Sequence, residues 1–238
     1  SHALKQSRYV TIELSTIYRQ TDENFVRILN AIRERRIDAN LLNRLNERYL
    51  PNFPADKSDG YIRLTTHNHT AQAYNEQRLN ELPTKAYAFQ AKVEGNFNES
   101  LFPADATLLL KQGAQVMFIR NDETGQGRYY NGKIGYVESL SQREIVVQCD
   151  DEAFAVEPSE WANSRYILDE ETKEIREEIE GTFRQYPLRL AWAITIHKSQ
   201  GLTFEKAVID AASSFAHGQV YVALSRCKSL EGLVLASP

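Results

Sequence analysis

Apolar residues near the N-terminal end of the chain recur at the spacing of an α-helix. Phe25, Ile28, Leu29 and Ile32 stand at positions i, i+3, i+4 and i+7, which places all four on one face of a helix. Thr21 precedes this stripe and is predicted to cap the helix, because a threonine hydroxyl can accept from the free N–H groups of a first turn. The pattern therefore predicts an amphipathic helix that packs on a core.

Other elements are predicted in the stretch up to the first long polar segment. Residues 9–14 are rich in β-branched side chains and predict a strand. Asp38 is predicted to cap a second helix, which ends before Pro51. Residues 61–64 predict a strand and residues 70–82 a helix, joined by a polar turn. This strand–turn–helix order is typical of half a βαβ unit.

The pattern changes to short, closely spaced strand-like runs from about Leu108. Asparagine and glycine turns separate these runs, and no helical pattern lies between them, so a small antiparallel β-barrel is expected. The acidic segment 169–181 that follows is predicted to be helical.

The α/β pattern returns after the barrel, with strands predicted at 188–195, 206–210 and 232–237 and a helix at 217–227. We therefore expect an α/β fold in which a parallel-sheet domain, residues 1–105 and 186–238, is interrupted by a β insertion at residues 106–185.

Composition narrows the class of protein. The chain has 238 residues and a formal net charge of −4, so any contact with nucleic acid must be local to one part of the surface or shared with a missing part of the protein. No apolar run approaches the length of a membrane span. Cys149 and Cys227 have neither metal-binding nor disulfide spacing, which suits a reducing cytosol. Ser1-His2-Ala3 resembles the remnant of an expression tag, so we expect a piece of a longer protein.

The segment Gly127 to Ile134, GRYYNGKI, comes close to the P-loop pattern G-x-x-x-x-G-K-[ST]. A P-loop needs a hydroxyl for Mg²⁺ in the last position and a helix directly after it. Ile134 provides no hydroxyl, and a strand-like run follows. We therefore expect a hairpin with Asn131-Gly132 as its turn, and no nucleotide site.

Aromatic and histidine side chains have more than one interpretation. Tyr129, Tyr130 and Lys133 could touch DNA at the tip of the expected hairpin, although exposed tyrosines are common in such turns. Trp192 is expected to be packed in the core. His217 is expected near the start of a helix, without a catalytic role.

Polar side chains gather where the predicted strand 188–195 ends. Parallel α/β sheets bind ligands at the carboxyl ends of their strands, and hydroxyl, imidazole, amine and amide groups suit contacts to phosphate and sugar. A polar loop that merely turns the chain is the alternative. Gly201 allows close approach of the backbone, and Arg226 stands late in an apolar helix, where it either meets an anion or extends to solvent. The strand-end residues are Thr195, His197, Lys198, Ser199 and Gln200.

A metal-dependent nuclease is one alternative function, suggested by His67 and His69. Two histidines alone do not complete a tetrahedral site, and no cysteine or further histidine lies nearby in the sequence. No metal site is therefore expected.

Several segments together resemble the conserved motifs of superfamily 1B DNA helicases, with the closest similarity to the Pif-type branch and its RecD-type relatives. The segments, in the order of that family, are 17–33, 63–82, 108–122, 129–137, 191–204 and 218–233. The resemblance implies a RecA-like second motor domain, of the P-loop NTPase fold, with an inserted Src-homology-3-like barrel. It also implies ATP with Mg²⁺ as the cofactor.

In this family ATP lies between two RecA-like domains, and the first domain supplies the P-loop lysine and the Mg²⁺ ligands. The resemblance implies that such a domain precedes Tyr9 and is a partner of this one. Arg19 and Arg226 match the arginines that meet the γ-phosphate, a role that suits a planar, permanently charged group. Gly201 and Thr203 match positions on the nucleotide side. The piece alone is expected to turn over no ATP.

The resemblance also assigns a track for single-stranded DNA, and implies single-stranded DNA and DNA duplex junctions as partners and 5′-to-3′ movement. It implies a cytoplasmic or nucleoid-associated helicase. A non-catalytic module that binds nucleic acid or protein is the alternative, mildly favoured by the net acidity. The matching DNA-contact residues are Thr66, His67 and Asn68 in one set, and Thr195, His197, Lys198, Ser199 and Gln200 in the other.

Overall fold

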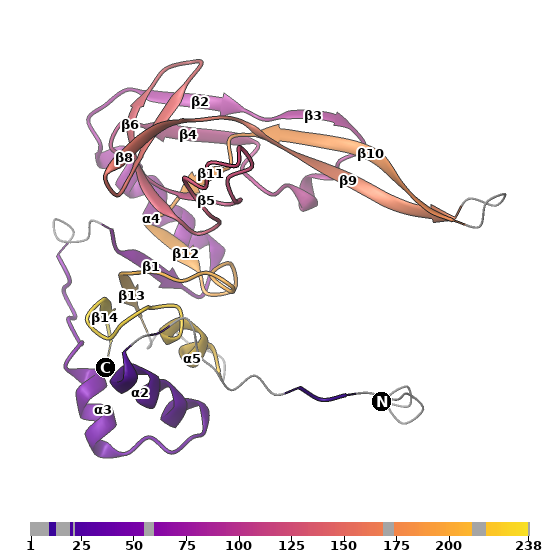
Figure 1. The fold of residues 1–238 in the computed structure, drawn as a ribbon. Coiled ribbons are helices and arrows are strands. Elements are labelled where there is room, and N and C mark those ends of the chain that lie inside the picture. The colour runs from indigo at the N-terminus through magenta and orange to yellow at the C-terminus, as the bar shows by residue number, and fades with distance from the viewer. Residues whose placement is uncertain are drawn as a thin grey trace.

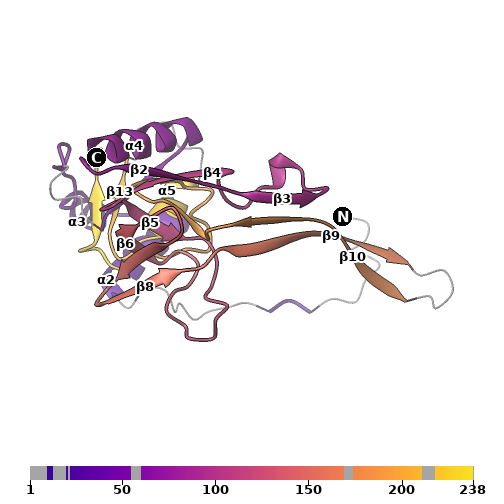
Figure 2. The same cartoon turned by 90° about the horizontal axis from the view of Figure 1, so that it is seen from above.

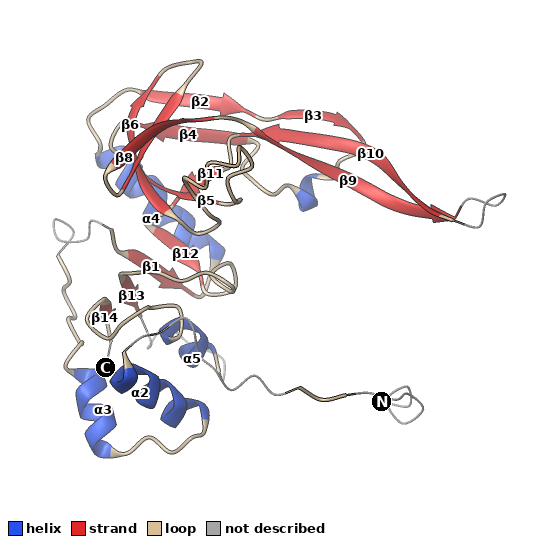
Figure 3. Ribbon diagram, viewed as in Figure 1, coloured by secondary structure: helices blue, strands red, loops and turns tan. Residues whose placement is uncertain are grey.

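The computed structural model describes residues 10–12, 20, 22–54, 60–168, 174–210 and 218–237. Its elements form two lobes, one above the other in Figure 1. The first lobe contains a parallel sheet and the four α-helices of the described residues, and the second contains almost only strands (Figure 3).

The parallel sheet of the first lobe has four strands in the order β12-β1-β13-β14, and all three pairings are parallel. Its strands are short and mostly apolar, because helices and loops cover both faces. This sheet confirms the expected mixed α/β fold. The strands are β1 Ile62–Thr65, β12 Ala193–Thr195, β13 Ala207–Ile209 and β14 Leu233–Leu235.

Four α-helices surround this sheet. Helix α4 packs along β1 and β12, while α2 contacts α3 and α5. The predicted apolar stripe of α2 is confirmed, since Phe25, Ile28 and Leu29 are buried in the core. The helices are α2 Glu23–Arg33, α3 Ala39–Asn46, α4 Asn68–Glu81 and α5 Gln219–Leu224.

Aspartate side chains cap the first two of these helices. Asp38 caps α3 as predicted, because its Oδ1 accepts from the N–H of Leu41 at 2.9 Å. The predicted cap of α2 was wrong. Asp22 is the N-cap, accepting from the N–H groups of Asn24 and Phe25 at 3.0 and 3.1 Å, and Thr21 lies outside the described residues. A carboxylate one residue later reaches the same free N–H groups.

The second lobe contains three antiparallel sheets, in the orders β11-β5-β6-β7-β8, β3-β10-β9 and β2-β4, and one short 3₁₀ helix, η2. Close strand spacing without intervening α-helices agrees with the sequence pattern. The elements are β2 Ala86–Gln90, β3 Lys92–Gly95, η2 Glu99–Leu101, β4 Thr107–Lys111, β5 Gln115–Phe118, β6 Ile134–Leu140, β7 Ile145–Cys149, β8 Glu152–Val156, β9 Ser159–Leu168, β10 Ile175–Gln185 and β11 Leu188–Leu190.

Three predicted elements differ from the structure. The described part of the acidic segment 169–181 is not helical, because residues 175–181 pair with β9 and cross-strand pairing outweighs the helix propensity of glutamate. The predicted strand 188–195 is two strands in different sheets. Residues 10–12 are not in a strand, and the rest of the predicted strand 9–14 lies outside the described residues.

Each lobe has its own hydrophobic core. Gln115 of β5 joins the lobes, because its fully buried amide donates to the carbonyls of Tyr61 and Ala191 at 3.0 and 2.9 Å and accepts from the N–H of Gly60 at 3.2 Å. A satisfied buried amide fixes the relative placement of the strands that it joins.

Other sequence expectations concern burial. Trp192 is packed in the core as predicted, and His217 lies outside the described residues. Cys149 and Cys227 are free thiols, and burial raises the pKa of each to about 11, so both are protonated at neutral pH. Within the described ranges, every helix is too short or too polar to cross a membrane.

Candidate functional site

Two polar segments meet at one edge of the parallel sheet. Strands β1 and β12 are neighbours in register, with Thr65 opposite Thr195, and the N–H of Ile196 donates to the carbonyl of Thr65 at 2.9 Å. The polar residues that follow each strand therefore start side by side. The structure thus brings together the two residue sets that the sequence places far apart.

The turn after β12 divides its residues into a supporting and an exposed group. Ser199 is fully buried and its hydroxyl donates to the carbonyl of Ile196 at 2.7 Å. Thr195 is buried too, and its hydroxyl accepts from the N–H of Lys198 at 3.4 Å. Both hydroxyls thus bond to the backbone of the turn, and Thr195 also lines the groove described below. The side chains of this turn that face solvent are His197, Lys198 and Gln200.

The segment after β1 is more open. Thr66 is half-buried, and its hydroxyl lies 2.7 Å from Nδ1 of His67. His67 and Asn68 are exposed, and Asn68 is the first residue of α4. The rings of His67 and His69 are 5.3 Å apart, but the described residues contain no group of three or more His, Cys, Asp or Glu side chains that could hold a metal ion. This edge carries hydrogen-bonding groups.

A groove of about 360 Å³ opens beside this edge, between α4, β12 and the second lobe. Two cations line it, Lys198 from the turn and Arg189 from β11. Burial lowers the pKa of Arg189, and burial together with the charge of Arg189 lowers the pKa of Lys198. Two carboxylates, Asp105 and Glu76, line the groove as well, so its formal charges balance. An anion bound beside Lys198 and Arg189 would relieve the repulsion between these two like charges.

Arg189 is a site residue that the sequence interpretation missed. One of its terminal nitrogens donates to the carbonyl of Pro103 at 3.1 Å, which holds the side chain at the groove. A signal was present, since Arg189 is the one charged residue in the otherwise apolar run 188–194. A continuous strand prediction hid it, because the chain changes sheets at residues 191 and 192.

Asn75 is a second missed residue, and it positions α4. Its side-chain amide donates to the carbonyl of Ala193 at 2.8 Å and accepts from the N–H of the same residue at 2.8 Å. Ala71 and Leu79, one turn to either side, are buried. A polar residue within an apolar i, i+4, i+8 stripe was the available signal. This double hydrogen bond fixes the middle of α4 against β12, beside the groove.

Arg226 follows Ser225, the residue that caps the C-terminal end of α5. It is buried, and its Nε donates to the carbonyl of Val222 at 3.0 Å while a terminal nitrogen donates to the hydroxyl of Ser225 at 2.9 Å. The guanidinium is thus held close to its own helix. Arg226 would have to exchange these bonds to contact a phosphate.

Gln20 connects the two segments predicted to carry the arginines. Its buried amide donates to the carbonyls of Ser225 and Cys227, at 2.9 and 3.2 Å, on both sides of Arg226. Arg19 itself lies outside the described residues. The sequence interpretation used the arginine of this segment and overlooked the neighbouring glutamine.

Gly201 and Thr203 lie on the chain between the turn and Arg226. Gly201 has φ +84°, and an added Cβ would meet no atom within 4 Å. Glycine is therefore favoured at position 201 by its left-handed backbone conformation and not by lack of space for a side chain. Thr203 is half-buried.

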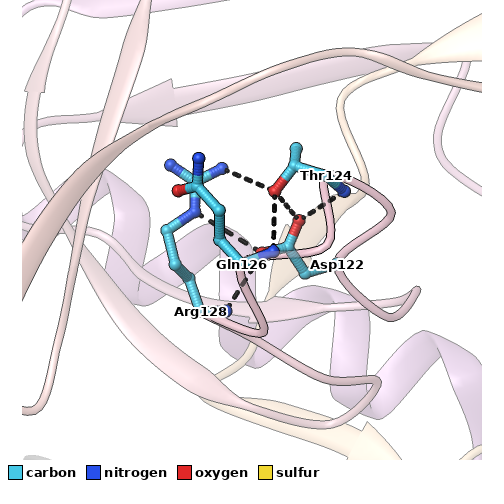
Figure 4. A network of polar contacts seen from close by, with 4 residues as sticks. All are labelled: Asp122, Thr124, Gln126 and Arg128. Atoms are coloured by element: carbon cyan, nitrogen blue, oxygen red, sulfur yellow. Dashed lines mark hydrogen bonds and ion pairs between the residues drawn. The ribbon is translucent and has the colours of Figure 1, made fainter.

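The GRYYNGKI segment belongs to the long connection between β5 and β6, residues 119–133. Asp122 organises this connection, accepting from the N–H and hydroxyl of Thr124 at 2.9 and 2.7 Å and from the N–H of Arg128 at 3.0 Å (Figure 4). Burial alone would raise the pKa of this carboxyl, but the hydrogen bonds from Thr124 and Arg128 outweigh it and lower the pKa to about 2.

The expected contact of Tyr129 with DNA was wrong. Its ring is buried and stacked on Phe118, with centroids 3.9 Å apart, because the connection folds back onto the core of the second lobe. Tyr130 is exposed, and Lys133 forms an ion pair with Asp150. The turn at Asn131-Gly132 is confirmed, with φ +98° at Gly132, and it packs on Leu202. The expected tight hairpin is not formed, because residues 127–130 are not in a strand and β6 pairs with β5 instead.

Comparison with known proteins identifies similar chains. No protein-family model matches the chain. The ATP-dependent DNA helicase PIF1 of Homo sapiens is 33% identical over 252 residues, which covers 98% of this chain and 36% of the human protein. The chain thus spans about a third of the length of this relative.

Two solved structures of a Bacteroides Pif1 are similar as well. The unliganded protein gives a TM-score of 0.84 at 38% identity, covering 93% of this chain and 51% of that one. The Bacteroides Pif1 bound to single-stranded DNA gives a TM-score of 0.67 at 39% identity, covering 94% of this chain and 51% of that one. The arrangement described above is therefore closer to the unliganded one. With its motif order, parallel sheet and these similarities, the chain belongs to the Pif1 family of DNA helicases.

Proposed function

We propose that the chain is the second, C-terminal RecA-like motor domain of an ATP-dependent DNA helicase that moves 5′ to 3′. The second lobe would be the inserted Src-homology-3-like barrel with its extensions. Strands β2 and β3 pair with β4 and β10, so we place the start of the insertion after α4. Family membership and the polar sheet edge support this proposal.

The observation that carries the DNA-binding part is the groove at the ends of β1 and β12. Its two cations, Lys198 and Arg189, suit a phosphate backbone, and the exposed polar groups of His67, Asn68 and Gln200 lie on the adjoining turns. Contacts of this kind are made to phosphate and sugar and ignore base sequence. We assign Thr195 and Ser199 to holding the turn, with Lys198 as the direct contact.

The nucleotide part rests on Arg226 and Arg19. In this proposal ATP with Mg²⁺ binds between this domain and a preceding RecA-like domain that carries the P-loop and the Mg²⁺ ligands. Closure of the two domains would draw Arg226 from the carbonyl of Val222 to the γ-phosphate. Gln20 would keep the two arginine-bearing segments together during this movement.

Replacement of Arg226 by alanine in the full-length helicase tests the nucleotide part. ATP turnover stimulated by single-stranded DNA should fall by about 10³-fold or more, as for arginine fingers in other NTPases. Affinity for a labelled oligo-dT strand should stay close to that of the wild type, because Arg226 does not line the groove. The 238-residue chain alone should show no ATP turnover.

Controls separate a role in chemistry from a role in folding. Arg226→Lys keeps a positive charge but not the bidentate geometry, and should also lose turnover. Both variants should show a wild-type circular dichroism spectrum. Equal loss of DNA affinity and turnover would mean that Arg226 is structural. A full-length protein that binds DNA but never turns over ATP would instead indicate a non-catalytic binding module.

A further inference from the structure

Strands β9 and β10 form a long hairpin that projects from the second lobe (Figures 1 and 2). Strand β3 pairs with β10 only at residues 181–184, so residues 175–179 have β9 as their single partner. A two-stranded ribbon without a packed face is marginally stable by itself. The outer half of the hairpin is therefore a surface that gains stability from being covered.

One face of this outer half is apolar. Leu168 pairs with Ile175, and Tyr166 and Ile179 follow on the same face because side chains alternate along a strand. Their exposed fractions are 72% for Tyr166, 59% for Leu168, 73% for Ile175 and 62% for Ile179. Four large apolar side chains gathered on one exposed face are uncommon, and such a patch marks an interaction site.

The opposite face has a different character. Arg165 forms ion pairs with Glu178 at 3.1 Å and with Glu180 at 3.2 Å. The charges on this face are paired with one another, and a charged face of this kind is suited to contact with water. One apolar and one charged face is the pattern of a strand pair that is buried on one side. The apolar face is therefore the one prepared for a partner.

The hairpin also holds part of the negative charge of the chain. The described residues of the hairpin, 159–168 and 174–185, contain five acidic and three basic residues, a net charge of −2, which is half of the formal net charge of the whole protein. On the apolar face, Glu177 lies between the four apolar side chains and its carboxylate accepts from the hydroxyl of Ser164 at 2.6 Å. Such a surface repels nucleic acid and attracts cations.

We infer that this apolar face is a docking site for a partner protein, and that its occupant is a basic, amphipathic segment. The apolar side of that segment would cover Tyr166, Leu168, Ile175 and Ile179, while its lysine or arginine side chains would meet Glu177 and the acidic residues along the hairpin. A second copy of the chain would place like charges together, and DNA would do the same. This inference is independent of the proposed motor function.

A designed peptide provides a direct probe. A fluorescein-labelled peptide of leucine and lysine, patterned as an amphipathic helix, should bind the chain in an anisotropy titration, and binding should weaken with salt. The double variant Tyr166→Ser with Ile179→Ser should bind it about tenfold more weakly or worse. Leu101→Ser removes an equally exposed apolar side chain outside the hairpin and should bind as the wild type does.

Other results would overturn the inference. Equal binding of the peptide to the double variant, no binding to the wild type, or equal binding of a leucine–glutamate peptide would each do so. Self-association of the wild type in sedimentation equilibrium that the double variant loses would assign the face to a second copy. A loss of forked-DNA affinity in the double variant, with the affinity for the peptide unchanged, would assign it to DNA.

Discussion

Single residues at this site often act by organising the backbone around them. Asp122 holds the connection between β5 and β6 through Thr124 and Arg128, and that connection packs on Leu202 through Gly132. The connection therefore supports the segment after β12 from the second lobe. A change at Asp122 is felt at a distance because it releases several donors together.

Asp122→Asn should destabilise the chain by about 1–3 kcal/mol at neutral pH, the range for buried groups that lose a charged partner. The folded-state pKa of about 2 is below the ordinary value of 3.8, so the stabilisation is complete above about pH 4 and is lost as the pH falls toward 2. Urea unfolding of both proteins at several pH values measures this. The difference between them should shrink in that acidic window.

Asp151→Asn is the matched control for this prediction, because Asp151 is exposed. It should change the free energy of unfolding by no more than about 0.5 kcal/mol at any pH. A difference between wild type and Asp122→Asn that stays constant down to pH 2 would show that the charge of Asp122 is not what stabilises the connection.

The limits of sequence reasoning are clear at this scale. The residue types alone predicted the polar turn after β12. They did not predict the burial of Ser199, because the sequence does not distinguish a serine that donates to a backbone carbonyl from one that faces solvent. Tyr129 was placed at a hairpin tip because local turn signals say nothing of the stacking of its ring on Phe118, which lies before the turn in the chain and beside Tyr129 in the fold.

Elements were predictable where their signal was local. Helix α3 followed from its cap at Asp38, and α2 from its apolar stripe. Strand β10 was missed because its glutamates favour a helix, and only pairing with β9 makes it a strand. The break between β11 and β12 was missed because both are apolar, and sheet membership depends on contacts with β5 and β1.

Helix α4 illustrates how one element sets up the site. Asn75→Ala removes both hydrogen bonds to Ala193 and should destabilise the chain by about 1–3 kcal/mol. It should also weaken binding of oligo-dT, since the start of α4 borders the groove. Thermal or urea unfolding together with anisotropy measures both effects.

Gln77→Ala, on the exposed side of the same helix, is the control and should change stability by less than about 0.5 kcal/mol. Wild-type stability in Asn75→Ala would mean that packing of Ala71 and Leu79 alone holds α4 in place.

At the scale of the whole molecule, the two lobes have separate cores and both contribute residues to the groove. Gln115 ties them together, and Lys198 and Arg189 both line the groove between them. The charge of the molecule is divided as well. The described residues of the β9–β10 hairpin carry a net charge of −2, so part of the acidity of the chain lies on residues that do not line the groove.

The affinity for single-stranded DNA as a function of salt tests the central claim, that this groove binds the DNA backbone. Lys198→Ala and Arg189→Ala should each bind labelled oligo-dT more weakly than the wild type at low salt. Each should also reduce the slope of log affinity against log salt by about 0.7, the value for one lost phosphate contact on a single strand. Lys92→Ala, an exposed lysine of β3, should leave both quantities unchanged. Identical slopes for all four proteins would contradict the assignment of the groove to DNA.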